Sequence, residues 1–264
     1  MNCRRLTWRI LALAASGLAS IVWADPAPGL IYVHTVRANT TLTATGAAAR
    51  PLLRGESFAA TGQALTVPSG QALALVLSNG AAAYMPDGGR LTVGEFTQEP
   101  VTDQKKDPTY EPSRSNLSLK LDAGTLVVTS RIPVPTSTFT LTTPLAQFKF
   151  HSSSELIVQV KADSVIVTLD QGTADLLVPE TGFTETLQKG QTATLTRETL
   201  HQPYPLKLDR TTTVQGSQFG QWVALARWAT DRVDFNFDGK QWHPSLVVPF
   251  DFTQQTSADD PRFR

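Results

Sequence analysis

The sequence contains a single cysteine, Cys3, so the chain cannot form an internal disulfide bond. Charged residues are also scarce, at 17% of the 264 residues, against roughly 25% in an average globular protein. The 23 basic and 23 acidic residues cancel, whereas nucleic-acid-binding proteins usually carry a basic excess. The hydrophobic fraction of 41% is too high for a disordered chain. These features favour a nearly neutral globular protein without a nucleic-acid partner.

Long apolar runs are missing too, apart from one near the N-terminus. This uncharged run extends from Ile10 to Trp23, about 14 residues, whereas a membrane-spanning helix needs about 20. It follows three arginines and ends just before Ala24, a pattern that predicts a cleavable signal peptide over residues 1–24. Cys3 precedes the run, which argues against a lipoprotein. We therefore expect a periplasmic or secreted protein without a stable membrane span.

Removal of residues 1–24 would change both the charge and the cysteine content. Three of the 23 basic residues would be lost, leaving 20 against 23 acidic ones and a net charge of about −3. The only cysteine would be lost as well. A chain without thiols suits an oxidising compartment outside the cytoplasm.

Alternation of apolar and polar residues dominates the rest of the sequence, in which threonine and valine are frequent. Branched side chains favour strands, and alternation with a period of two places one set of side chains on a buried face. The pattern is clearest from Ser137 to Thr196. It predicts an all-β fold, a sandwich or roll of many short, mostly antiparallel strands, with one C-terminal helix.

Turn signals divide this β-rich sequence. Asn79-Gly80 lies between two apolar runs and predicts a hairpin with a type I′ turn. Asp122-Ala123-Gly124 predicts a turn between two further strands. The segment 98–116, rich in proline and charge, predicts a polar insertion loop. We assign residues 25–199 to one β-domain that contains this loop.

Residues 200–264 form a C-terminal extension in this interpretation. Leu200 to Thr213 contains two prolines and predicts a connector, and the last dozen residues predict a polar tail. Apolar residues at helical spacing predict a helix over residues 218–232. This helix would pack on the β-domain or bind a partner, and the sequence leaves both possibilities open.

No arrangement of residues typical of catalysis is present in the sequence. The four histidines lie far apart and outside metal-binding patterns: His34, His151, His201 and His243. The Ser152-Ser153-Ser154 tract follows His151, but neighbouring strand residues point to opposite faces, so we expect a polar turn rather than a Ser–His dyad. We expect no catalytic residue, no cofactor-binding residue and no metal ligand, and hence a protein that is not an enzyme.

Two further features have a structural and a functional interpretation. Asp234, Asn236 and Asp238 precede Gly239 as in the first half of a calcium loop, but the acidic residue expected six positions later is Ser245. The same segment alternates as a strand that ends in a turn at Asp238-Gly239.

Trp228 and Trp242 would stack on sugars if exposed, or else pack in the core.

Segments between Leu52 and about Thr196 resemble the FecR domain in their order and spacing. After a first hairpin over 73–80, the resembling segments are L-K-L-D-A-G-T-L (Leu119–Leu126), T-P-L-A (Thr143–Ala146), V-I-V-T-L-D-Q-G-T-A (Val165–Ala174) and L-Q-K-G-Q (Leu187–Gln191). The chain departs from the family at 150–156, where F-H-S-S-S-E-L lacks the Arg and Gly of an R-G-T tract.

The resemblance implies an all-β, non-enzymatic domain of the cell envelope. The family's founding member regulates iron-siderophore signalling, spans the inner membrane and acts on a sigma factor through a cytoplasmic segment. The sequence contains neither part, so sigma-factor regulation is not carried over.

The leading functional hypothesis is a non-catalytic exported domain that binds a protein partner in the envelope through exposed edges or loops. A carbohydrate-binding module for surface glycans and a diverged periplasmic signalling regulator are the alternatives.

Overall fold

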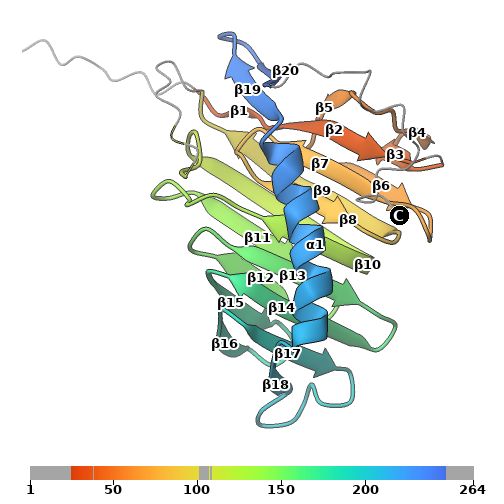
Figure 1. Ribbon diagram of the computed structural model, residues 1–264, viewed down its shortest axis with the longest axis vertical. Coiled ribbons are helices and arrows are strands. Elements are labelled where there is room, and N and C mark those ends of the chain that lie inside the picture. Colours follow the sequence, from red (N-terminus) through yellow and green to blue (C-terminus); the bar gives the residue numbers. More distant parts are fainter. Residues whose placement is uncertain (1–24, 38, 101–106, 108, 248–264) are drawn as a thin grey trace, which may run out of the picture.

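The computed structural model describes residues 25–37, 39–100, 107 and 109–247. The predicted signal peptide, the centre of the insertion loop and the predicted tail lie outside the described residues. Strands β1 to β18 form one continuous hydrogen-bonded sheet that folds into two layers, with the helix α1 (Thr213–Thr230) lying across one of them (Figure 1). The predicted all-β sandwich with one C-terminal helix is confirmed.

The layer under α1 is called the helix layer and the other the second layer. In spatial order, the helix layer contains β5 (Ser57–Ala59), β2 (Leu30–Val36), β7 (Leu73–Leu77), β8 (Ala82–Met85), the end of β10 (Ser115–Thr129), β13 (Glu155–Val160), β14 (Ser164–Gln171), β17 (Gln191–Thr196) and β18 (Leu206–Arg210). The second layer contains β4 (Arg50–Pro51), β3 (Thr41–Ala44), β6 (Gln63–Val67), β9 (Gly89–Gln98) with β1 (Ala27–Pro28) beside its end, the start of β10, β11 (Thr138–Thr142), β12 (Gln147–Phe150), β15 (Thr173–Val178) and β16 (Phe183–Gln188).

Strand β10 belongs to both layers. Its first part lies between β9 and β11, and its last part, Gly124–Thr129, lies between β8 and β13. The ladder with β11 is parallel and the other three are antiparallel. The 15-residue length of β10 makes it long enough to serve both layers.

The segment Asp122-Ala123-Gly124, predicted as a turn between two strands, is instead the point where β10 passes from one layer to the other. Gly124 has a φ of +95°, and a Cβ there would overlap the backbone of Gly88 and Gly89. The glycine therefore allows two backbones to come close together, not a chain reversal.

Strand β7 is buried on both of its faces. Leu73, Leu75 and Leu77 lie in the core between the layers, whereas Ala74 and Val76 lie in a second core under α1. Two-sided burial explains why β7 and β8 are almost continuously apolar and lack alternation.

The helix α1 packs on the helix layer through the stripe that the sequence predicts. Phe219, Val223, Ala226 and Ala229 are buried against that layer. The helix begins at Thr213 rather than at 218, and it ends at Thr230 rather than at 232. Within the described part of the chain, no helix has the length and apolar character needed to cross a membrane.

Two other local predictions need correction. The hairpin at Asn79-Gly80 is present between β7 and β8, but only Gly80 has a positive φ, at +83°. Because a type I′ turn needs positive φ at both residues, this is a type I turn followed by a left-handed glycine. The predicted connector 200–213 contains β18, which pairs with β17 and extends the helix layer.

The strand beyond α1 follows the alternation that the sequence shows. Strand β19 (Val233–Phe237) pairs with β20 (Trp242–Leu246) in a separate two-stranded sheet. Val233 and Phe235 point into the core under α1, as predicted.

Substitution of Ala226 by Leu tests the close packing of α1. Ala226 is fully buried, so the added volume should reduce the free energy of unfolding by about 1–3 kcal/mol. Ala224→Leu is the matched control, because Ala224 is exposed on the same helix. Urea unfolding of both variants measures the difference, and equal stabilities would contradict this packing.

Candidate functional site

The insertion loop leaves and rejoins the sandwich through buried polar side chains. At its start, Gln98 accepts a hydrogen bond from the Ser78 hydroxyl at 2.6 Å and donates to the Ser113 hydroxyl at 3.0 Å. Gln98 and Ser78 are each 1% exposed. A buried amide satisfied in this way has little freedom to move, so this end of the loop is fixed to the sheet.

The returning end is fixed by Glu111, which is buried. Its carboxylate accepts hydrogen bonds from the Ser115 hydroxyl and from the Val134 N–H, the latter at 3.2 Å. Its own N–H donates to the Ile132 carbonyl at 2.9 Å. Burial raises the pKa of the Glu111 carboxyl, although these hydrogen bonds act in the opposite direction.

A small cavity of about 20 Å³ lies beside Glu111 and is lined by Asn79, Arg131 and Ser137 among others. This volume is little more than that of one water-sized probe. It is therefore too small for an organic ligand, and we assign the buried polar side chains around it to anchoring the loop.

Tyr110 projects from this anchored segment. Its side chain is 50% exposed, although its backbone forms a β-bridge with Ile132. The neighbouring Glu111 is buried, so an exposed aromatic ring lies next to a fixed backbone. The sequence showed a polar loop here and gave no signal for Tyr110, because exposure of a single aromatic residue depends on contacts distant in the chain.

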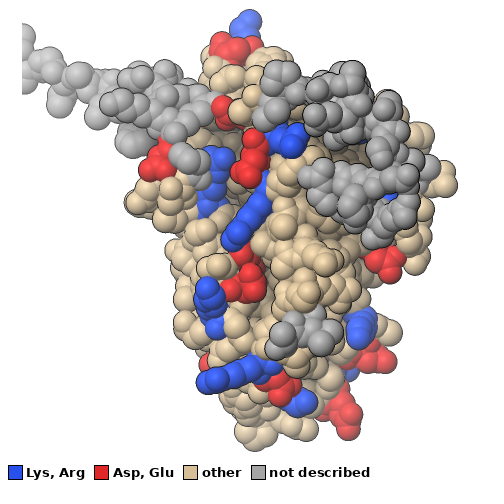
Figure 2. Space-filling model, viewed as in Figure 1, with Lys and Arg blue, Asp and Glu red and all other residues tan. Residues whose placement is uncertain are grey.

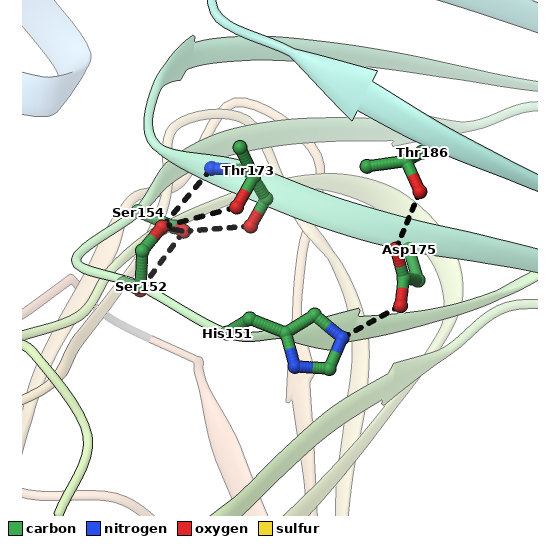
Figure 3. A network of polar contacts seen from close by, with 6 residues as sticks. All are labelled: His151, Ser152, Ser154, Thr173, Asp175 and Thr186. Carbon is green, nitrogen blue, oxygen red and sulfur yellow. Dashed lines mark hydrogen bonds and ion pairs between the residues drawn. The ribbon is translucent and has the colours of Figure 1, made fainter.

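The serine tract and His151 face different partners (Figure 3). His151 Nε2 lies 2.6 Å from a carboxylate oxygen of Asp175, and the Thr186 hydroxyl donates to the other oxygen at 2.8 Å. The hydrogen bond from Thr186, followed by His151, lowers the pKa of Asp175. The histidine ring points away from the serine hydroxyls, which gives no Ser–His dyad.

The serines instead form a polar turn against the connection at Gly172, where the chain passes from β14 in the helix layer to β15 in the second layer. The Ser152 hydroxyl accepts a hydrogen bond from the Thr173 N–H at 3.1 Å, and the Ser154 hydroxyl donates to the Thr173 carbonyl at 3.3 Å. Gly172, at φ +82°, leaves no space for a Cβ beside them.

The other two exposed histidines also have one carboxylate neighbour each. His201 lies 3.2 Å from Glu180, and His243 lies 2.8 Å from Asp238. Among the described residues, no group of three or more His, Cys, Asp or Glu side chains is arranged to hold a metal ion.

Asp238, a candidate calcium ligand, is used in the turn between β19 and β20. Its carboxylate accepts hydrogen bonds from the N–H groups of Lys240 and Gln241, at 2.8 and 2.9 Å. The Gln241 N–H, His243 and the Lys240 N–H lower its pKa to about 2. These contacts favour the strand-and-turn interpretation of the segment over the calcium loop.

The tryptophans considered for sugar stacking are packing residues. Trp242 is only 2% exposed and lies in the core under α1, which excludes it as a surface platform. The Trp228 ring meets His34 edge-on at 4.7 Å, and Arg232 lies over it at 4.3 Å. Burial, with Arg54 and Arg232 nearby, lowers the pKa of His34 to about 4, so this histidine is neutral near pH 7.

Charges of both signs are interspersed along α1 on the face shown in Figure 2. Arg227 of the helix forms an ion pair with Glu155 of β13. This face therefore has no patch of a single sign among the described residues.

Comparison with known proteins finds neither a matching protein-family model nor a matching curated sequence. Two crystal structures of a "putative anti-sigma factor" from Parabacteroides distasonis are similar in fold, each with a TM-score of 0.43. The first is 11% identical, with 60% of this chain and 64% of that chain covered. The second is 10% identical, with 71% and 86% covered. At these TM-scores the likeness identifies neither family nor function.

Replacement of Glu111 by Gln tests the anchor through its pH dependence. Because burial raises the pKa of Glu111 in the folded state, its stabilising contribution is complete below the unfolded pKa and is lost as pH rises through the folded pKa. Glutamine cannot ionise. We expect the stability of Glu111→Gln relative to the unmodified chain to increase from pH 4 to pH 8.

Urea unfolding across this pH range measures that difference. Glu99→Gln is the control, because Glu99 lies at the other end of the loop and pairs with Arg114 near the surface. If the stability difference between Glu111→Gln and the unmodified chain did not change with pH, the Glu111 carboxylate would not be destabilised by burial.

Proposed function

We propose that the chain is an exported, non-catalytic, FecR-like β-domain that binds a protein partner in the cell envelope through the anchored segment around Tyr110. The observation that carries this proposal is an exposed tyrosine ring on a backbone fixed by buried Gln98 and Glu111. Aromatic residues contribute strongly to protein interfaces. Fixing the backbone before binding reduces the entropy lost on association.

The sheet edges support recognition by this segment rather than by strand addition. The edge strand β18 carries Lys207, Asp209 and Arg210, and β20 contains Pro244. Charged residues and proline on edge strands oppose pairing with another chain. Of the two kinds of binding element expected from the sequence, exposed edges and exposed loops, these two strands favour the loops.

Sequence and structure agree on features that support membership of the FecR-like class. The L-K-L-D-A-G-T-L segment lies on β10 and contains Gly124, where this strand changes layers. The segment Val165–Ala174 covers most of β14 and the connection to β15, where Gly172 has a positive φ. Export is supported by the charge and apolar pattern of residues 1–24 and by the lack of cysteine after them.

Site-specific photo-crosslinking tests the proposed partner surface. The benzophenone amino acid is placed at Tyr110 in the full chain, expressed in the source organism, and adducts are identified by mass spectrometry. Tyr204 is the matched control position, because it is 48% exposed in a different segment, between β17 and β18. We expect a discrete adduct with one envelope protein from position 110 only.

The identity of the adduct also separates the two protein-binding hypotheses. An outer-membrane receptor or an anti-sigma protein as the partner would favour the signalling regulator. Absence of an adduct at position 110, or equal adducts at both positions, would contradict recognition by Tyr110.

A further inference from the structure

The outer face of the second layer carries two rows of side chains that are polar at every position except one, here called the polar face. One row crosses five strands as Ser118, Thr140, Lys149, Asp175 and Thr186. The next row crosses the same strands as Lys120, Thr142, Gln147, Leu177 and Thr184. Each member lies directly opposite the next in the ladder, so the rows follow the strand spacing of about 4.8 Å.

This regularity follows from alternation in the sequence. On four of the five strands the residue between the two rows points inward: Leu119, Leu141, Phe148 and Leu176 are buried in the core between the layers. The outward residues are all exposed or partly exposed. The core therefore holds each outward side chain on one continuous face.

The polar face is hollowed where β11, β12, β15 and β16 run side by side. Seven of its side chains line this shallow depression: Thr140, Gln147, Lys149, Asp175, Leu177, Thr184 and Thr186. His151 contacts one of these residues, Asp175, at 2.6 Å (Figure 3). The depression thus combines hydroxyl, amide, amino and carboxylate groups.

The charges of the polar face are compensated locally. Lys120 lies 2.7 Å from Asp122, and Lys149 faces Asp175, whose pKa it helps to lower. A compensated face attracts a polyanion weakly. Leu177 is the one apolar member of the two rows, so the face also lacks the apolar centre of a protein interface.

We propose that the polar face binds a neutral, hydroxyl-rich polysaccharide. Five hydroxyl groups and the Gln147 amide offer both donors and acceptors in rows, which is the chemistry that sugar hydroxyls complement. The ten side chains include no aromatic ring, so binding is weak for one sugar and depends on a chain that contacts several strands. This places glycan binding away from Trp228 and Trp242.

This ligand is separate from the protein partner proposed above, because the polar face does not include Tyr110. Tyr110→Ala should therefore leave polysaccharide binding unchanged. Failure of either proposal leaves the other to be judged by its own experiment.

Affinity electrophoresis of the mature chain through gels containing a neutral polysaccharide tests the proposal. The probes are a β-glucan, a mannan and a dextran, with heparin as the polyanionic control. The test variant is Thr140→Val with Thr184→Val, which removes two hydroxyls from the depression and keeps residues that favour strands. The matched control is Thr125→Val with Thr194→Val, both in the helix layer.

We expect retardation by at least one neutral polysaccharide and a loss of affinity of at least about tenfold in the test variant, from two lost hydrogen bonds. The control variant should keep the affinity of the unmodified chain. Urea unfolding of both variants confirms that they are folded. Binding to heparin alone, absence of retardation by every neutral polysaccharide, or equal losses in both double variants would overturn the proposal.

Discussion

The fold depends on one strand that is shared by two layers. Strand β10 pairs with β9 and β11 in the second layer and with β8 and β13 in the helix layer. At the passage between layers, the backbone at Gly124 lies against that of Gly88 and Gly89 with no space for a side chain. Because both layers share this strand, neither can open without breaking hydrogen bonds of the other.

The same arrangement decides which surfaces are available for binding. Burial of β7 and β8 on both faces requires an apolar cover, and α1 provides it with a stripe that includes two alanines. The helix thus completes the core, which favours packing on the β-domain over partner binding for this stripe. The anchored loop with Tyr110 and the polar face of the second layer lie outside this packing, and they are the surfaces proposed to bind a protein and a polysaccharide.

Local patterns predicted much of the fold but little of the proposed sites. Alternation places the strands from Ser137 to Thr196 correctly, and helical spacing identifies the buried stripe of α1, since both depend on neighbours in the sequence. The glycine at position 124 wrongly predicts a turn, because a turn and the close approach of two backbones both favour glycine. The burial of Trp242 and Glu111 depends on contacts between distant segments, which neither composition nor periodicity encodes.

The central claim is that the two layers and α1 form one cooperative unit joined by β10. Native-state hydrogen exchange of the chain, resolved by residue, tests it most directly. The account predicts that the slowest amides of β8, β10 and α1 share one opening free energy, equal to that of global unfolding. A lower opening free energy for α1 while β10 stays protected would contradict it, because the helix would then be a separate unit.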